Sequence, residues 1–320
     1  MKVEIPDAVK ADIPPTRWGK VLASTPVIMA VIATALAGLS SSEMSKAQYL
    51  RSLAAQQQSK AGDQWGYYQA KRLRETVLEE ELDVLNDREA VQPLDAAAFS
   101  AAVKALPAGG DRAADRDRLA QLVESPAGQA ALLALAAGAT AAPPAAALPP
   151  AVASGLAGLQ APSAGPAAVE PLSDEVMASA LRAARDQVAA YDQVTKPIAQ
   201  AIDQGEALLR TLAGDAQTRL LQRSLLAARL RWNAARYASE AHLNQTIANL
   251  EELAVARSNH AADHHHERSG RFFLGMLAAQ LGVIVATMAI AAKKRNLLWG
   301  FAAAAGLVSV VFASYVFAFV

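Results

Sequence analysis

The end of the chain carries the pattern that most limits its fold, two apolar runs separated by three basic residues. Residues 272–292 and 297–320 hold no charged side chain, and Lys293-Lys294-Arg295 stands between them. Each run has about 20 residues or more, and a helix of that length crosses a hydrocarbon core of roughly 30 Å. The pattern predicts a hairpin of two transmembrane helices with a cationic turn at residues 293–296.

A third uncharged stretch lies near the N-terminus. Residues 21–39 would form a helix about 28 Å long, just enough to cross a membrane. We interpret it as the first transmembrane helix; a signal peptide cleaved near Ala35-Leu36-Ala37 is the alternative. All three spans offer faces of small residues that favour close helix packing. These residues are Ala30, Thr34 and Gly38, then Gly275, Ala279 and Gly282, then Gly300, Ala304 and Gly306.

The distribution of positive charge predicts the orientation in the membrane. Basic residues precede the first span in the N-terminal arm (residues 1–20), and three more form the turn between the last two spans. Short segments rich in Lys and Arg stay in the cytoplasm. We therefore expect a cytoplasmic N-terminus, with the central region and the C-terminus outside the cytoplasm, in the periplasm of a bacterium.

The central region predicts an all-α fold. Alanine is abundant, aromatic residues make up 5% of the chain, and no alternating apolar pattern typical of strands is present. There is no cysteine, which excludes disulfides and thiolate metal sites. The chain has 30 basic and 30 acidic residues, and its central region has no basic excess, so we expect no nucleic-acid partner.

Proline, glycine and capping residues divide the central region. Pro93 ends one long helix, Asp95 is a good N-cap, Ser173 begins another helix, and Pro197 should kink it. The expected segments are an outgoing long helix (40–91), short helices (92–137), an Ala/Pro-rich linker (138–171), kinked helices (172–214) and a returning long helix (215–269), followed by the spans at 272–292 and 297–320.

The two long helices should pack against each other. Residues in both keep the 4-3-4 spacing typical of a coiled-coil-like seam, with a slip between the two sets in the first helix. These positions are Ala61, Trp65, Tyr68 and Arg72, then Leu78, Leu82 and Leu85 in the first helix, and Leu243, Ile247, Leu250 and Ala254 in the second. We predict an antiparallel helical stalk, with the short helices and the linker forming a small distal insertion.

One segment of the outgoing helix is unusually rich in large polar and aromatic side chains. Its candidate residues are Asp63, Trp65, Tyr67, Tyr68, Gln69 and Lys71. The structural interpretation is a packing point in a helix interface, where neighbouring polar groups satisfy the indole N–H and the phenol O–H groups. A recognition surface for a partner or a lipid headgroup is the functional alternative.

Histidines gather just before the second span. His260 and His264 share one helix face, and Asp263 and Glu267 share the adjacent one, a spacing that would suit Zn²⁺ or a similar ion. The full His-Glu-x-x-His pattern is absent. The alternative is a pH-responsive surface, since imidazoles gain charge together below about pH 6.5.

The order of these features resembles an uncharacterised bacterial family of three-span membrane proteins with a domain of unknown function. The resemblance rests on Asp63-Gln64-Trp65-Gly66-Tyr67-Tyr68-Gln69-Ala70-Lys71 after a first span, and on the segment from His264 to Phe272 before two further spans. It covers residues 20–90 and 215–320, and residues 92–215 look like an insertion. It implies an inner-membrane architecture and no established activity.

No pattern for phosphate binding or serine hydrolysis occurs, so we expect neither an enzyme nor a bound cofactor. The first hypothesis is an inner-membrane structural or interaction protein that contacts lipid, self-associates and binds another membrane protein. The second is a transport or channel accessory, or a small channel, based on Gln280 and Thr287; the lack of charge within the spans argues against it. The third is a metal or pH sensor based on the histidines.

Overall fold

A computed structural model shows a chain built from helices. It describes residues 17–88, 91–106, 112–141, 148–160, 172–212, 216–291 and 295–319. No strand occurs among these residues, as the composition predicts. The predicted N-terminal arm up to residue 16, and Lys293 and Lys294 of the predicted basic turn, lie outside the described residues.

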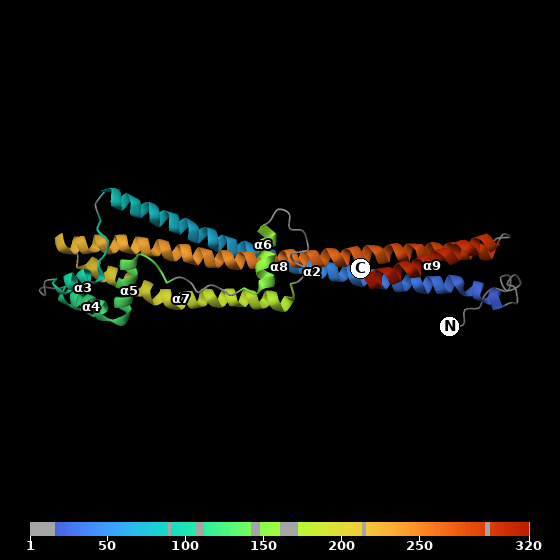
Figure 1. Ribbon diagram of the computed structural model, residues 1–320, viewed down its shortest axis with the longest axis horizontal. Coiled ribbons are helices and arrows are strands. Elements are labelled where there is room, and N and C mark those ends of the chain that lie inside the picture. The colour runs from blue at the N-terminus through green and yellow to red at the C-terminus, as the bar shows by residue number, and fades with distance from the viewer. Residues whose placement is uncertain are drawn as a thin grey trace. The chain divides into compact units, whose positions relative to one another are not determined.

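The chain divides into two compact units, and two long helices contribute to both. The first unit, Met1–Ala55 with Ala256–Val320, is called the span unit below; the second, Gln56–Val255, is called the stalk unit. Helix α2 (Arg17–Arg88) and helix α8 (Ala216–Ala291) are each continuous along their whole length (Figure 1). The predicted long helices at 40–91 and 215–269 therefore continue without interruption into the apolar segments beside them.

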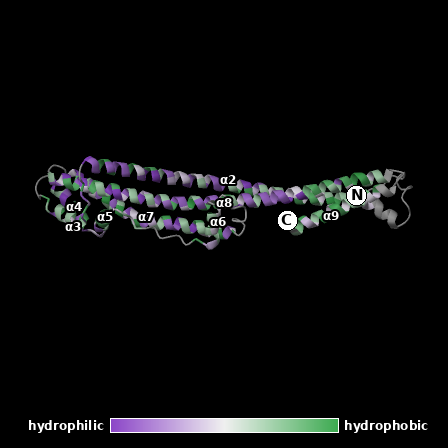
Figure 2. Cartoon of the chain, turned by 45° about the horizontal axis from the view of Figure 1, so that its top comes forward, coloured by the Kyte–Doolittle hydropathy of each residue, from purple (hydrophilic) through white to green (hydrophobic). Residues whose placement is uncertain are grey.

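The span unit contains three apolar helical segments. These are helix α9 (Arg295–Phe319) and the apolar parts of α2 and α8. Each of the three helices contains a stretch long and apolar enough to cross a membrane (Figure 2). Met29 and Ala33 of α2 pack on Ala279, while Leu36 packs on Phe272 and Val316. These contacts confirm an all-α fold with three helices suited to a membrane.

Only some of the predicted small faces are used in this packing. Gly275, Ala279, Gly282 and Gly306 are buried, and a Cβ atom at Gly282 would lie 2.4 Å from Cε of Met29. By contrast, Gly300 and Ala304 are exposed, and so are Ala30, Thr34 and Gly38 of span one. The predicted ridge in span one therefore faces away from α8 and α9, because α2 packs through Met29, Ala33 and Leu36 instead.

In the stalk unit, α8 packs against two other long helices. Helix α2 runs antiparallel to α8, since Trp65 contacts Glu252 and Lys71 contacts Glu240. Helix α7 (Asp174–Thr211) is also antiparallel to α8. Three side-chain contacts set its register: Arg185 with Glu251, Glu206 with Arg229, and Gln222 with the carbonyl of Leu209. The sequence predicted the α2 pairing and kinked helices at 172–214, and the structure shows one long helix in that region with Pro197 inside it.

Three short helices pack near the start of α8 and the end of α7. They are α3 (Ala96–Lys104), α4 (Ala113–Glu124) and α5 (Pro126–Ala137). Asp95 caps α3 by accepting a hydrogen bond from the Ala98 N–H, and Ser173 caps α7 in the same way from Val176, which confirms both predicted caps. Ser125 caps α5, and Gly138 ends it in the left-handed conformation.

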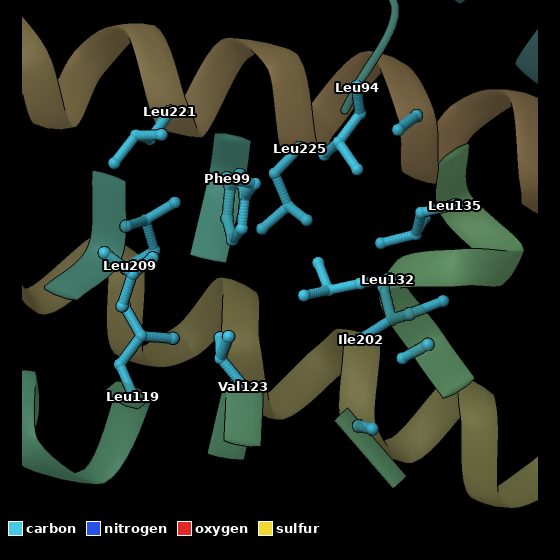
Figure 3. Close-up of a cluster of buried hydrophobic side chains, with 14 of the residues drawn as sticks. Leu94, Phe99, Leu119, Val123, Leu132, Leu135, Ile202, Leu209, Leu221 and Leu225 are labelled. Atoms are coloured by element: carbon cyan, nitrogen blue, oxygen red, sulfur yellow. The ribbon is translucent and has the colours of Figure 1, made fainter. Parts of the chain in front are cut away.

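These helices enclose the main apolar core. Figure 3 shows leucines and other apolar side chains from α3, α4, α5, α7 and α8 pointing toward one another. The core members include Leu94, Phe99, Leu119, Val123, Leu132, Leu135, Ile202, Leu209, Leu221, Leu225 and Trp232. The predicted short helices therefore form a helical head on the start of α8, with an apolar centre.

The predicted linker at 138–171 was partly wrong. Residues 150–160 form helix α6 (Pro150–Gln160), and its Val152 is fully buried. A Cβ atom at Gly155 would lie 3.1 Å from Cδ1 of Leu253, so α6 packs against α8 far along the helix from the head. Proline at the first helical position favours helix initiation, so Pro150 marks the start of α6 within an Ala/Pro-rich composition.

Candidate functional site around Trp65

The Trp65 segment of α2 is where the stalk unit makes its most specific polar contacts. Trp65 donates its indole N–H to Oε1 of Glu252 on α8, with 2.7 Å between nitrogen and oxygen. The Tyr68 ring meets the Trp65 ring edge to face, with centroids 5.3 Å apart. The aromatic pair and the charged acceptor together fix one register between α2 and α8.

A second contact lies two turns further along α2. Lys71 forms an ion pair with Glu240, whose other carboxylate oxygen lies 3.6 Å from Nε of Arg236. Lys71 and Arg236 also lie over the ring of Tyr237, at 5.1 and 4.8 Å from its centroid. Two cations thus share one carboxylate and one aromatic face in a half-buried setting, where cation–π contacts gain strength from partial desolvation.

A groove opens beside these contacts, between α2, α7 and α8. Its volume is about 390 Å³, and its lining includes Gln64, Tyr67 and Lys71 of α2, Arg185 and Tyr191 of α7, and Glu240 and Asn244 of α8. Burial raises the pKa of Tyr191, whose side chain is almost fully enclosed. Oε1 of Gln64 is buried without a hydrogen-bond partner among the described residues. The groove is therefore lined by both basic and acidic side chains.

The predicted site residues divide into two groups in the structure. Trp65, Tyr68 and Lys71 face α8 and make the contacts described above, as the packing interpretation requires. Asp63, Tyr67 and Gln69 are exposed, and Tyr67 borders the groove. Packing and surface presentation thus occupy opposite sides of one segment, with Tyr67 at the boundary.

The residues predicted as metal ligands find other partners. In the span unit, Asp263 pairs with Arg51 at 3.3 Å, and Glu267 pairs with Arg271. His260 is half-buried and His264 is exposed. Among the described residues, no three His, Asp or Glu side chains come close enough to hold a metal ion. The four predicted ligands therefore do not form a metal site among the described residues. The two acids, Asp263 and Glu267, form ion pairs with arginines instead.

Sequence reasoning missed a buried contact beside them. Nδ1 of His265 lies 2.5 Å from Oε2 of Glu43, and the Glu43 side chain is almost fully buried. One turn away, Ser40 and Ser269 each donate to the other's backbone carbonyl, at 3.0 and 2.8 Å. The antiparallel register of the two helices was a usable signal, since it pairs residue 43 with residue 265.

The charge of Glu43 is favoured by its surroundings. Burial alone would raise the pKa of Glu43, but the hydrogen bonds from His265 and Lys46 and the positive charge of Arg268 outweigh it, so the pKa lies below its ordinary value of 4.5. Glu43 therefore stays ionised at neutral pH. It forms a polar contact between α2 and α8 just outside residues 21–39.

Gln280, a lone polar side chain within the second span, predicts an interhelical hydrogen bond that helps hold the helices together. Gln280 is exposed and makes no hydrogen bond with another described residue, whereas Ser309 of α9 donates to the carbonyl of Gly275 at 3.0 Å. Thr287 is exposed and bonds only to its own helix, at the carbonyl of Ile284. The interhelical hydrogen bond expected from Gln280 is thus made by Ser309.

Comparison with known families finds a likeness for the N-terminal third of the chain. The model of a family described as Domain of unknown function (DUF4337) matches residues 18–121. The matched segment includes the Trp65 segment but not its partners Glu240 and Glu252 on α8. Searches of curated proteins and of solved structures gave no significant match.

Proposed function

We propose that this chain is a non-enzymatic structural or interaction protein of a bacterial inner membrane. Three spans anchor it, and the stalk unit is presented to partners outside the cytoplasm. The observation that carries the proposal is the continuity of α2 and α8, each of which contains an apolar stretch and a long amphipathic stretch in one uninterrupted helix.

The contacts around Trp65 support a role in shape more than in chemistry. Trp65 and Lys71 are committed to α2–α8 packing, where Glu252 and Glu240 satisfy their polar groups, and Lys71 also lies over the Tyr237 ring. The exposed residues of the same segment, with Tyr67 at the groove, remain for recognition. A scaffold needs both a fixed register between its helices and an exposed surface that a partner can bind.

Orientation is the first part of the proposal to test. The chain has no cysteine, so a single introduced thiol reports its own location. In intact spheroplasts, a membrane-impermeant maleimide should label Ala127→Cys on the exposed side of α5. It should label Asn296→Cys in the predicted turn only after lysis, because three cations hold that turn in the cytoplasm. The reverse labelling pattern would refute the orientation.

Self-association is the second part. Copies anchored in one bilayer share an orientation, and the exposed ridge of Ala30, Thr34 and Gly38 leaves a lipid-facing surface on which a second span can pack closely. Chemical crosslinking in native membranes should return dimers or larger species. Recovery of monomer alone, at expression levels that crosslink a known oligomer, would argue against this part.

A pH-responsive sensor is the second candidate function, and the Glu43–His265 contact favours it. This contact joins α2 and α8 within the span unit, with Lys46 and Arg268 as neighbouring charges. If it senses pH, His265→Gln should abolish any pH dependence of partner binding while leaving the membrane anchor intact. Identical pH profiles for wild type and variant would remove this candidate.

A further inference from the structure

The distal part of α2 carries an apolar stripe that no described part of the chain covers. Leu73, Val77 and Val84 are spaced four and seven residues apart, so they lie on one face of the helix. Their exposed fractions are 67%, 43% and 51%. The leucines at 78, 82 and 85 lie on the opposite side and are half-buried. This part of α2 is therefore apolar on two sides, and only one of them is partly covered.

The segment that carries this stripe is strongly acidic. Between residues 75 and 87 the chain has six carboxylates and no base. Glu80 falls on the stripe itself, between Val77 and Val84, and Glu81 borders it. We call Leu73, Val77, Glu80, Glu81 and Val84 the outer α2 face.

Of these carboxylates, only Glu75 is paired with a base in the part of the chain that the structure describes. Glu75 pairs with Arg72, but Glu79, Glu80, Glu81, Asp83 and Asp87 form no ion pair with a described residue. Two arginines of α8 pair with other acids: Arg229 pairs with Glu206 of α7, and Arg236 with Glu240. The outer α2 face thus combines exposed apolar anchors with uncompensated negative charge.

That combination selects among possible occupants. Two copies of this chain in one membrane are parallel under the proposed function, so pairing through this stripe would set Glu80 against its equivalent at the centre of the seam, which is repulsive. A bacterial membrane surface is anionic and would repel the same carboxylates. A cationic partner gains both from burying the three apolar side chains and from pairing the acids.

We propose that the outer α2 face docks a basic amphipathic helix of another protein. Apolar residues at four- and seven-residue spacing on the partner pack on Leu73, Val77 and Val84, and Lys or Arg side chains flanking them pair with Glu80 and Glu81. The inference deepens the proposed function by naming a partner chemistry, and it rests on that function for the parallel arrangement of copies.

A synthetic peptide tests the surface directly. The probe is a fluorescein-labelled helical peptide with leucines at this spacing and flanking lysines, and its control has glutamates in place of the lysines. Binding to the full-length protein is followed by fluorescence anisotropy, in nanodiscs of zwitterionic phosphatidylcholine so that lipid does not attract the peptide. The basic peptide should bind and lose affinity as salt is raised, because exposed ion pairs are screened; the acidic peptide should not bind.

Matched variants locate the binding. Val77→Ser/Val84→Ser should weaken binding by roughly tenfold or more, and Glu80→Gln/Glu81→Gln should do the same while flattening the salt dependence. The control is Val194→Ser, an equally exposed valine on α7 (52%), which should leave affinity unchanged. All substituted side chains are exposed, so the helical circular dichroism signal should be unchanged.

Three outcomes would overturn the inference. Equal binding of the acidic and basic peptides would remove the electrostatic argument. Equal affinities for wild type and both double variants would place the binding elsewhere. A fall in oligomer mass caused by Val77→Ser/Val84→Ser would make the face a contact between copies. None of these results changes the thiol-labelling pattern, so a failure of the proposed membrane orientation remains separately visible.

Discussion

The two units bury their helices by different means. In the stalk unit the core is made of large apolar side chains, such as Leu209, Leu225 and Phe99, that fill the space between helices. In the span unit the closest contacts are made at small residues, with Met29 of α2 lying against Gly282 and Gly306. Large side chains therefore pack the stalk unit, whereas small residues allow close helix contacts in the span unit.

The contrast follows from the surroundings each unit suits. In water, removing apolar surface drives association, so larger side chains stabilise a core. Lipid tails are as apolar as leucine, so spans associate through close packing and hydrogen bonds such as the one from Ser309 to Gly275. Substitutions should consequently act differently in the two units, and the following experiments are ordered by the size of the expected effect.

Truncating a core leucine should have the largest effect. Leu209→Ala leaves a cavity at a fully buried position on α7, and such changes cost roughly 2–5 kcal/mol in the free energy of unfolding. Hydrogen–deuterium exchange on the full-length protein should show faster exchange in α3, α4, α5 and α7. Leu133→Ala, at an exposed position on α5, is the matched control; equal effects of the two would contradict the assigned core.

Adding a single methyl group separates the two units more finely. A Cβ atom at Gly128 would lie 1.8 Å from the backbone oxygen of Leu122, so Gly128→Ala must open the turn between α4 and α5, at about 3 kcal/mol, the upper end of overpacking costs. At Gly282 the obstacle is only the flexible end of Met29, which can move. Gly282→Ala should therefore cost less than about 1 kcal/mol.

The thermal unfolding midpoint in detergent measures both changes. Gly66→Ala, with no atom within 4 Å of the added Cβ, should not lower the midpoint. Gly300→Ala is the corresponding control in the span unit, since its Cβ also meets open space. If Gly282→Ala proved as damaging as Gly128→Ala, the distinction between rigid and adaptable neighbours would fail.

Much of the fold could be predicted because length and periodicity carry it. The three spans follow from uncharged runs, and the two long helices follow from charged segments without proline. Helix α7 was predicted only as kinked helices at 172–214 because of Pro197, yet a proline inside a helix is tolerated where packing compensates for the lost hydrogen bond. Helix α6 was not predicted because an Ala/Pro-rich composition is typical of a linker, although Pro150 favours the start of a helix.

Only the α2 residues of the candidate site could be predicted from the sequence. The residues on α2 stand out by type, but their partners Glu240 and Glu252 are ordinary acids among many on α8. Pairing them requires the register between two helices, which a single sequence constrains weakly. The His265–Glu43 contact shows the same limit. The cluster of histidines stands out in the sequence, whereas the acid that lies opposite it does not.

Breaking the Trp65 contact should have a moderate effect. Trp65→Phe keeps an aromatic ring but removes the N–H that Glu252 accepts, and losing a charge-assisted hydrogen bond at a half-buried site should cost about 1 kcal/mol. Exchange should rise in α2 around residue 65 and in α8 around residue 252. Tyr67→Phe on the same segment is the control, because Tyr67 is exposed and bonds to no described residue. Equal exchange in both variants would contradict the proposed register.

The last expected effect is similar in size to that of Trp65→Phe but depends on pH, and it lies in the span unit. The pKa of Glu43 is lowered on folding, so its contribution to stability is present above pH 4.5 and is lost as the pH falls through the lowered value. Glu43→Gln cannot ionise and should be less stable than wild type by about 1 kcal/mol at neutral pH, with the difference shrinking in acid. Unfolding midpoints measured from pH 7 to pH 3 test this.

The control Glu267→Gln removes an exposed carboxylate and should leave a nearly constant, small difference. A pH-independent gap for Glu43→Gln would mean that the contact with His265 contributes shape alone, and that polar contacts in this unit work as its glycines do, by allowing two helices to come close.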